Sequence, residues 1–263
     1  AAEVIKTHHN DTALVRELRQ KGHVIEPLAD YHKDEVRALG RDLGLPEHLV
    51  ARQPFPGPGL AIRIICADSK PDIDEEFHNT NKKLKYLLTK FNPDDTTTPA
   101  PTELAELRDD EREVFRRLLK TTHISAILLP LKTVGVQGDG RSYKYVCALS
   151  SDNIAASATG TEQQQSDMFS PDWQELFGLA KFLPKIYHNI NRVVYVFGQR
   201  IYEPITEITP TKLTKDVIAQ LQEADDCVNS VLIERDQMKR LSQAPIILFP
   251  VGFEQGKTHR SIA

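Results

Sequence analysis

Proline and glycine alternate in the segment from Arg52 to Arg63, Arg-Gln-Pro-Phe-Pro-Gly-Pro-Gly-Leu-Ala-Ile-Arg, and they leave its backbone little freedom. Each proline fixes its own φ and keeps the preceding residue out of the α region. We therefore expect the segment to be extended. Its glycines would admit a ligand or a second backbone at close range, and its arginines could hold an anion. The residues alone leave two interpretations open, a proline-rich spacer or an anion-binding wall.

The composition is typical of a soluble intracellular protein. The chain has 263 residues, 40% of them apolar and 27% charged, with a net charge of −4, so it can bury one large core or two smaller ones. Cys66, Cys147 and Cys227 are far apart and odd in number, which favours reduced thiols over a disulfide framework or a metal site. No apolar run has the length of a signal peptide core or a membrane span. We expect a cytoplasmic (cytosolic) protein with neither nucleic acid nor membrane as a partner.

The first fifty residues have the periodicity of an α/β domain. The expected elements are a helix through Gln20 that is capped by Asn10 or Asp11 and stopped by Gly22, a short strand at 24–28, and a second helix from near Asp30 to Gly44. This order of elements suits a doubly wound sheet.

Charged and imidazole side chains gather in Ile-Lys-Thr-His-His-Asn, residues 5–10. If this segment is extended, side chains alternate, so Lys6 and His8 point to one side and His9 to the other. A closing loop could then present two cations together. Two adjacent histidines alone are weak evidence, because they are more often exposed or metal-free structural residues.

Both segments resemble the GMP synthases, the glutamine-dependent family that aminates XMP to GMP. The proline and glycine segment is similar to the family's junction between its ATP-pyrophosphatase and dimerisation domains, with Gln53 in place of the usual histidine. Residues 5–10 match the Ile-Lys-Ser/Thr-His-His-Asn lid of the family at every position. The resemblance implies that Lys6, His8 and His9 are catalytic, in ATP binding and adenylyl transfer, and that Arg52 binds XMP. A positioned ammonium would stabilise the negative charge that develops on the phosphates.

Beyond Leu60 the pattern changes to α+β. The first expected elements are a β-rich run at 61–66, a polar stretch at 92–101, an amphipathic helix at 103–120 and a strand at 126–131. A helix follows from 171, with Trp173, Leu176, Phe177, Ala180 and Leu183 facing inward, and then a strand at 192–197. The last elements are a long helix at 213–239, with one buried stripe from Val217 to Leu232, and a closing strand entered through a buried Gln243. Residues 152–170 are poor in bulky apolar side chains, so we expect a disordered insertion there.

Gly138-Asp139-Gly140 stands between two alternating segments, which predicts a hairpin over residues 133–143. By itself Asp139 could be a turn residue that tolerates positive φ. The segment is similar to the GMP-synthase motif Val-Gly-Val-x-Gly-Asp-x-Arg-x-Tyr, whose aspartate contacts XMP. The Ser-Gln-Ala-Pro segment around Gln243 resembles the family's Ser-Gln-x-Pro, whose glutamine binds XMP, although a lone glutamine at a strand start is usually a satisfied structural side chain. Asp139 and Gln243 are therefore candidate substrate-binding residues.

The resemblance covers essentially the whole chain except the insertion. It implies that residues 1–56 are the C-terminal α/β part of an ATP-pyrophosphatase (adenine nucleotide α-hydrolase-like) domain and that residues 57–263 are an α+β dimerisation domain, partly duplicated as in the long eukaryotic form. The implied enzyme is a ligase that adenylates XMP with ATP and Mg²⁺ and then lets ammonia, made by the glutaminase domain of the same enzyme, displace AMP. Its phosphate loop, its glutaminase residues and its terminal Glu-Trp-Glu tail are missing from this sequence. We therefore expect an internal fragment, inactive alone, with ATP and Mg²⁺ held mainly by the missing N-terminal part; the sequence leaves a homodimer open.

Two alternatives remain. NAD synthetase shares the pattern of the cluster from Lys33 to Arg37, which is similar to the N-type ATP pyrophosphatases generally, but it lacks the proline and glycine junction and the domain that follows. That cluster could also be a solvated helix face, since Lys33 and Arg37 are spaced i, i+4. A non-catalytic dimerisation or interaction module is the second alternative, because residues beyond Leu60 carry no complete catalytic constellation.

Overall fold

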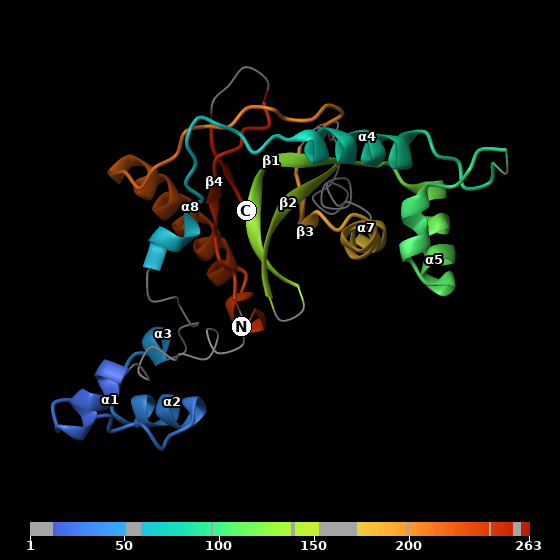
Figure 1. The fold of residues 1–263 in the computed structure, drawn as a ribbon. Helices are drawn as coiled ribbons and strands as arrows, with labels where there is room; N and C mark the ends of the chain where they lie inside the picture. Colours follow the sequence, from blue (N-terminus) through green and yellow to red (C-terminus); the bar gives the residue numbers. More distant parts are fainter. Residues whose placement is uncertain are drawn as a thin grey trace. The chain divides into compact units, whose positions relative to one another are not determined.

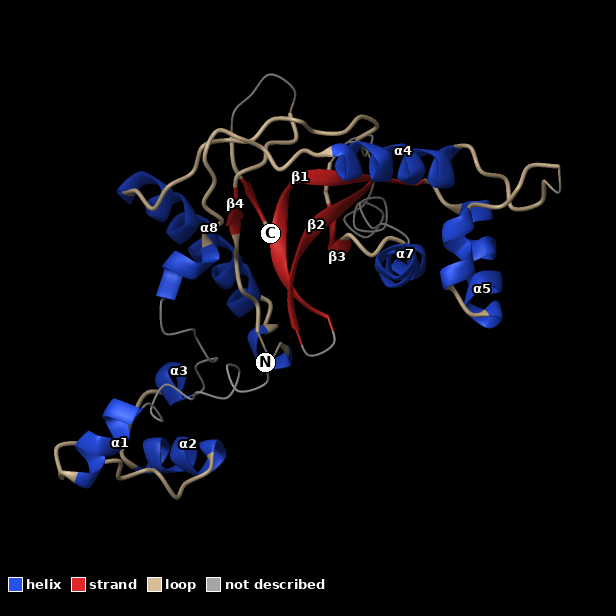
Figure 2. Cartoon of the chain, viewed as in Figure 1, coloured by secondary structure: helices blue, strands red, loops and turns tan. Residues whose placement is uncertain are grey.

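The computed structural model describes residues 13–50, 59–95, 97–137, 140–152, 173–198, 200–241, 243–254 and 259–263 (Figure 1). The chain divides into two compact units, one of residues 1–59 with 231–245 and one of residues 60–230 with 246–263. The described part of the first unit contains helices but no strand, whereas the second contains helices and two small sheets (Figure 2). The fold is therefore mixed α and β, and none of its described helices is long and apolar enough to cross a membrane.

Three helices make up residues 13–50, namely α1 (Ala13–Gln20), α2 (Lys33–Asp42) and α3 (Glu47–Val50). The predicted helix stops are confirmed, since Gly22 and Gly44 have φ of +70° and +79°, a conformation that glycine adopts without steric cost. The expected cap by Asn10 or Asp11 lies outside the described residues.

The strand predicted at 24–28 is wrong. These residues form loop and turn, and Ile25 is 84% exposed. A strand leaves backbone N–H and C=O groups that need a neighbouring strand, and no described residue pairs with this segment.

The proline and glycine segment is described only at its end. Gly59–Arg63 forms the 3₁₀ helix η2, so the extended conformation predicted through Arg63 is wrong there. The reason is local: Pro58 is the last proline, and nothing after it restricts φ. The β-rich run at 61–66 reduces to single bridges, in which Ile64 pairs with Leu248 and Ala67 with Thr211.

Helix α4 (Glu75–Thr89) was not predicted from the sequence. Its N-cap is Asp74, whose carboxylate accepts a hydrogen bond of 2.8 Å from the Phe77 amide. The helix predicted at 103–120 is confirmed from residue 109 onward as α5 (Asp109–Thr121), but its first turns form the separate 3₁₀ helix η3 (Thr102–Glu106). Arg112 stabilises this break by donating to two carbonyl oxygens, of Leu104 at 3.0 Å and of Leu107 at 2.8 Å.

The main sheet has three strands in the order β1 (Ile124–Gln137), β2 (Gly140–Ser151), β3 (Ile190–Tyr195). The predicted hairpin is confirmed, because β1 and β2 pair antiparallel as far as Gln137 and Gly140. Strand β3, predicted at 192–197, lies at Ile190–Tyr195 and pairs parallel to β2; Gly198, with φ of +119°, follows it. Apart from Asp152, the insertion predicted at 152–170 lies outside the described residues.

Alternate side chains of the sheet enter two cores, as the period of two in a strand requires. One face contributes Leu128, Tyr145, Cys147 and Leu149 to a core shared with α4, α5 and α7 (Trp173–Ile186). The other face packs against residues near the C-terminus. That second core contains Ile127, Leu129, Leu131, Val146, Ala148, Phe249 and Val251.

Helix α7 buries a different face from the one predicted. Leu176 and Leu183 are buried as expected, but Trp173 is 46% and Phe177 65% exposed. At 3.6 residues per turn, two residues along a helix differ by about 200°, so Phe177 points nearly opposite to the fully buried Leu179.

The last elements are shorter than predicted. The long helix α8 spans Lys215–Glu234, and only its first half carries the buried stripe, with Val217 and Leu221 buried but Val231 51% exposed. The closing strand is reduced to β4 (Leu248–Phe249), which pairs antiparallel with β5 (Ser261–Ile262).

Candidate functional site

The outer half of the β1 and β2 hairpin, residues 133–137 and 140–144, is a two-stranded ribbon. Its register pairs Val134 with Tyr143 and Gln137 with Gly140, so the two residues between the strands are Gly138 and Asp139. Strand β3 pairs with β2 only from Tyr145 onward, so no described third strand continues beside the ribbon. Val134 and Tyr143, opposite each other, are 41% and 70% exposed. The ribbon therefore exposes the side chains of Val134 and Tyr143, while its base is fixed in the sheet.

Three polar groups anchor the base of this ribbon. Lys132 Nζ lies 3.1 Å from the Asp74 carboxylate and 4.6 Å from the centre of the Tyr145 ring. The hydrogen bond from the Phe77 amide, followed by that from Lys132, holds the pKa of Asp74 below its ordinary value. Burial raises the pKa of the Tyr145 phenol, which keeps it protonated. With Asp74 ionised and Tyr145 neutral, the cluster is suited to fixing β1 against α4 rather than to proton transfer near neutral pH.

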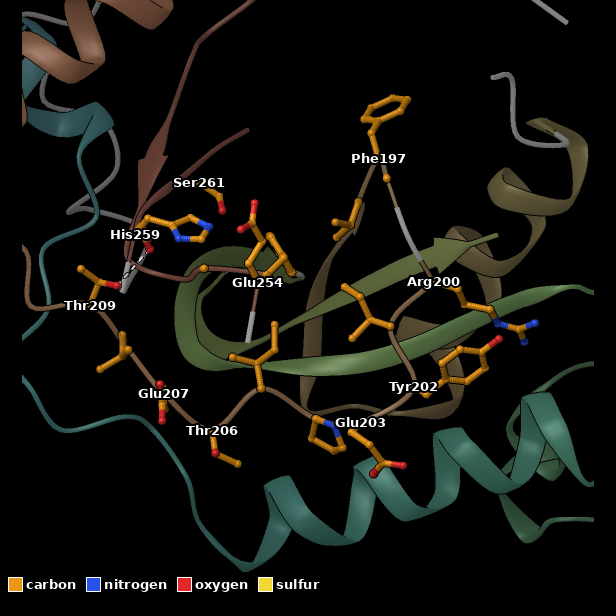
Figure 3. Close-up of a pocket in the computed structure, with 18 residues that line it drawn as sticks. Phe197, Arg200, Tyr202, Glu203, Thr206, Glu207, Thr209, Glu254, His259 and Ser261 are labelled. Carbon is orange, nitrogen blue, oxygen red and sulfur yellow. Dashed lines mark hydrogen bonds between the residues drawn. The ribbon is translucent and has the colours of Figure 1, made fainter. Parts of the chain in front are cut away.

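A groove of about 1030 Å³ in the second unit runs between the segment after β3 and the segment that leads into β5 (Figure 3). The sequence predicted no functional residue in this groove. Its charged lining consists of Arg200, Glu203, Glu207, Glu254 and His259.

Several contacts order the groove wall. The Arg200 guanidinium lies 5.2 Å from the centre of the Tyr202 ring, and the Thr209 hydroxyl donates to the His259 carbonyl at 2.9 Å (Figure 3). The Glu203 carboxylate accepts a hydrogen bond of 2.6 Å from Lys85 on α4. Three carboxylates against one guanidinium do not favour a phosphate, which needs an excess of donors, so this groove is a poor candidate for a nucleotide site.

The ranges that the structure describes contain no group of three or more His, Cys, Asp and Glu side chains arranged to hold a metal ion. The Mg²⁺ implied by the family resemblance stays a prediction.

Five of the six predicted site residues, Lys6, His8, His9, Arg52 and Asp139, lie outside the described residues. Gln243 is described, in the loop before β4 within the unit of residues 1–59 and 231–245. The prediction of a buried amide is wrong, since Gln243 is exposed; the strand that was expected to enclose it begins only at Leu248. Its exposure leaves the amide accessible to a ligand, and its role in binding stays a prediction.

Curated proteins of one kind match the chain over nearly its full length. A GMP synthase (glutamine-hydrolysing) of Dictyostelium discoideum is 46% identical over 272 residues, covering 100% of this chain and 35% of that protein. A probable GMP synthase of Caenorhabditis elegans is 41% identical over 283 residues, covering 97% of the chain and 36% of the relative. A probable GMP synthase of the bacterium Leptospira interrogans is 30% identical over 257 residues, covering 97% of this chain and 34% of that protein. No family model matches the chain.

The resemblance predicted from short motifs is thereby confirmed. Because the Leptospira relative also matches 97% of the chain, similarity over nearly the whole length is not confined to eukaryotic proteins. The chain spans about a third of the length of the curated relatives it matches. It is a relative of the glutamine-hydrolysing GMP synthases and corresponds to one portion of them.

Proposed function

We propose that this chain is part of an enzyme that converts XMP to GMP, using ATP and ammonia derived from glutamine. The observation that carries the proposal is the 46% identity to a GMP synthase over the whole chain. A non-catalytic module is not favoured, because the whole chain, and not only its sheet region, matches a GMP synthase. XMP and ATP are the proposed ligands, the glutaminase domain of the same enzyme is the proposed partner, and the cytosol is the proposed compartment.

In this proposal one segment, residues 5–10, carries the catalytic side chains, and three separate residues bind XMP. Lys6, His8 and His9 would close over the nucleotide and stabilise charge on the phosphates as XMP is adenylated. Arg52 would add a donor for the XMP phosphate. Asp139, between the strands of an exposed ribbon, and Gln243, exposed before β4, would hydrogen-bond XMP. Mg²⁺ with ATP would supply charge neutralisation at the phosphates, and no step here is assigned to it.

The domain organisation is proposed on the same basis. Residues 1–56 would be the end of an ATP-pyrophosphatase domain and residues 57–263 a dimerisation region; the division into compact units at residues 59 and 60 supports a boundary near this point. Partial duplication is supported by Ile-Leu-Leu-Pro-Leu at 127–131 and Ile-Leu-Phe-Pro-Val at 247–251. Each of these segments belongs to or overlaps the first strand of an antiparallel pair, β1 with β2 and β4 with β5.

The overall activity is tested with two proteins, this chain and a complete enzyme that contains it. The complete enzyme should release pyrophosphate only when XMP and ATP are both present, and should form GMP when glutamine is added. The chain alone should do neither, because it contains no phosphate loop to cradle the nucleotide. Pyrophosphate release by the chain alone, dependent on XMP, would contradict this division of the enzyme.

The substrate residues are tested in the complete enzyme with Asp139→Ala and Gln243→Ala. Each should raise the Michaelis constant for XMP by tens of fold, since a hydrogen bond to a bound ligand is worth about 1–3 kcal/mol, while the constant for ATP changes little. Asp226→Ala and Gln222→Ala are matched controls, because both residues are exposed on α8. An unchanged XMP constant with a lowered melting temperature would assign Asp139 and Gln243 to structural roles.

A further inference from the structure

A second hollow, of about 670 Å³, lies within the second unit between the start of α4, the helix η3 and the end of α7. Helices α4 and α7 pack into the same core on one face of the sheet (Figure 1). The side-chain amide of Asn189 donates to the Thr80 hydroxyl at 2.8 Å, and the Asn189 carbonyl accepts from the Tyr145 amide at 2.8 Å. These bonds tie the residues after α7 to α4 and to β2. The hollow, here called the α4–α7 cleft, is therefore held open without a ligand.

One buried polar side chain of this cleft has no partner. Tyr187 lines the cleft and is 5% exposed, and no residue in the described part of the chain hydrogen-bonds its hydroxyl. A buried phenol usually finds such a partner. Burial, followed by the charge of Glu103, raises the pKa of Tyr187, so the hydroxyl stays protonated and can both donate and accept. A ligand in the cleft with a hydrogen-bonding group would supply the missing partner.

The charge of the cleft is negative and only partly compensated. Four carboxylates line it, those of Asp74, Glu75, Glu76 and Glu103. Lys132 lies 3.1 Å from the first of them, and Lys83 lies 2.7 Å from the last. Glu75 and Glu76 form no ion pair with a described residue, and their place in the first turn of α4 favours their ionised form. Two negative charges are therefore left for a ligand.

The end of α7 adds a further acceptor and an apolar surface. The helix ends in the cleft at Ile186, and the last carbonyl groups of a helix lack intrahelical partners and carry partial negative charge. His188 follows, but it lies 3.6 Å from Glu106, so a protonated imidazole there is already matched. Ile186 and the ring of Tyr187 offer apolar surface to methylene groups. The combination suits a molecule with cationic ends and an aliphatic middle.

We propose that the α4–α7 cleft binds an aliphatic diamine, with one ammonium group at Glu75 and Glu76, the other at the Tyr187 hydroxyl and the carbonyl end of α7, and the methylene chain between them. Both amines of such a molecule are protonated near neutral pH, so its two charges match the two unpaired carboxylates. The volume of the cleft is in the range of small-molecule sites. The inference does not rest on the proposed function, since none of the proposed substrate residues lines this cleft.

Calorimetric titration of the complete enzyme with 1,4-diaminobutane, in the absence of nucleotides, tests the proposal. The diamine should bind at one site per chain. 1-Aminobutane has the same carbon chain with one charge and should bind at least about tenfold more weakly. Mg²⁺ has the same charge without the chain, so at constant ionic strength millimolar Mg²⁺ should weaken diamine binding by less than about twofold.

Two variants locate the site. Glu75→Gln combined with Glu76→Gln should weaken diamine binding at least about tenfold, because it removes both unpaired charges and keeps the size of the side chains. Tyr187→Phe should weaken binding about fivefold, the effect of one hydrogen bond, since phenylalanine keeps the ring. An unchanged melting temperature in each variant shows that the loss does not come from unfolding.

Asp109→Asn combined with Asp110→Asn is the matched control. These adjacent carboxylates lie in the first turn of α5, where their side chains are 97% and 73% exposed, and they do not line the cleft. The control changes the net charge by the same amount as the double variant on α4. It should leave diamine binding unchanged.

Several results would overturn the proposal. Equal weakening by the two double variants would mean that the diamine responds only to the overall charge of the protein. Displacement by millimolar Mg²⁺ would assign the carboxylates to metal ions, and wild-type binding in Tyr187→Phe would remove the phenol from the site. Absence of binding up to about 10 mM diamine would leave the cleft without the proposed ligand.

Discussion

The helices of residues 13–50 and the three-stranded sheet show opposite relations between sequence pattern and burial. Helix α1 has no buried residue, and α2 buries only Gly40. In the sheet unit, by contrast, Leu84, Phe115 and Tyr145 are fully buried. Both regions have clear amphipathic periodicity, so periodicity alone does not decide whether a face is covered.

The difference separates what nearby residues determine, the helix boundaries, from what distant residues determine, the burial of a face. In the first region, helix boundaries follow from propensity and from Gly22 and Gly44, which need no tertiary partner. Its apolar side chains remain exposed, with Leu14 at 64%, Ile25 at 84% and Leu43 at 72%. Exposed apolar side chains of this kind are available for contact with other protein. In the proposed enzyme, the remainder of the ATP-pyrophosphatase domain would cover them.

The largest expected effect is on the stability of the sheet unit. Phe115 on α5 is fully buried and packs against Phe182 of α7, with ring centres 5.1 Å apart. Phe115→Ala should lower the free energy of unfolding by about 3–5 kcal/mol through lost transfer energy and a residual cavity. Leu14 is 64% exposed, so Leu14→Ala should lower the free energy of unfolding by less than about 0.5 kcal/mol. Denaturant unfolding of this chain, followed by near-ultraviolet circular dichroism, measures both; equal losses would contradict the contrast between the regions.

A second test separates chemistry from stability. In the complete enzyme, Lys6→Met should slow adenylyl transfer by about a hundredfold, the scale expected when one preorganised charge is removed from a transition state. XMP binding and the melting temperature should be unchanged, because Lys6 is proposed to act in a lid and not in a core. XMP-dependent pyrophosphate release is the measurement. His8→Ala and His9→Ala should act in the same direction but less strongly, and a wild-type rate in Lys6→Met would leave residues 5–10 an ordinary loop.

Sequence predicts best where one residue type determines the local backbone. The hairpin was predicted because alternating segments flank Gly138-Asp139-Gly140, and the pairing of Gln137 with Gly140 agrees. The irregularity within β1 could also have been noticed, since Pro130, which has no N–H, lies where the register shifts between Leu128 and Lys132.

Predictions failed where tertiary partners decide the structure. The segment 24–28 has the composition of a strand but no described neighbour to pair with. Helix α4 was missed because polar residues interrupt its apolar positions; two of them, Thr80 and Asn81, are buried because they bond to distant groups, Thr80 to Asn189 at 2.8 Å and Asn81 to the Leu128 amide at 2.9 Å. The irregularity at Asn191, which lies between the partners of Tyr145 and Val146, was missed for the same reason, since it exists only once β2 and β3 pair.

The third test uses acid to weaken the sheet unit selectively. The Glu111 side chain on α5 is 8% exposed and pairs with Lys185 of α7. The hydrogen bond from Lys185, with that from Arg108, lowers the pKa of Glu111 from its ordinary 4.5 to about 2. Because the folded state favours the ionised form, this contribution to stability is complete above pH 4.5 and is lost as the pH falls from 4.5 toward about 2.

Unfolding midpoints measured across that pH range check this prediction. Glu111→Gln should flatten the acid-induced loss of stability, since its side chain does not ionise. Glu113→Gln is the control, because Glu113 lies on the same helix with 58% of its side chain exposed and pairs with Arg117 at 3.1 Å; it should change the profile little. An acid profile identical in wild type and Glu111→Gln would contradict the assigned pairing of α5 with α7.

The smallest expected effect is confined to the first region. Gly22 ends α1 with φ of +70°, and a Cβ added there meets no atom within 4 Å, so Gly22→Ala changes only the backbone energy. The left-handed conformation costs a non-glycine residue about 1 kcal/mol, so the last turn of α1 should fray. Hydrogen exchange should accelerate about fivefold at the amides of Gly22 and His23, which bond to the carbonyls of Arg19 and Leu18.

Gly22→Asn should accelerate this exchange less than Gly22→Ala, since asparagine tolerates the left-handed conformation better. Sheet amides should be unaffected by either variant; if their exchange also accelerates, the helices of residues 13–50 and the sheet unfold as one cooperative unit, and the contrast between the two regions fails.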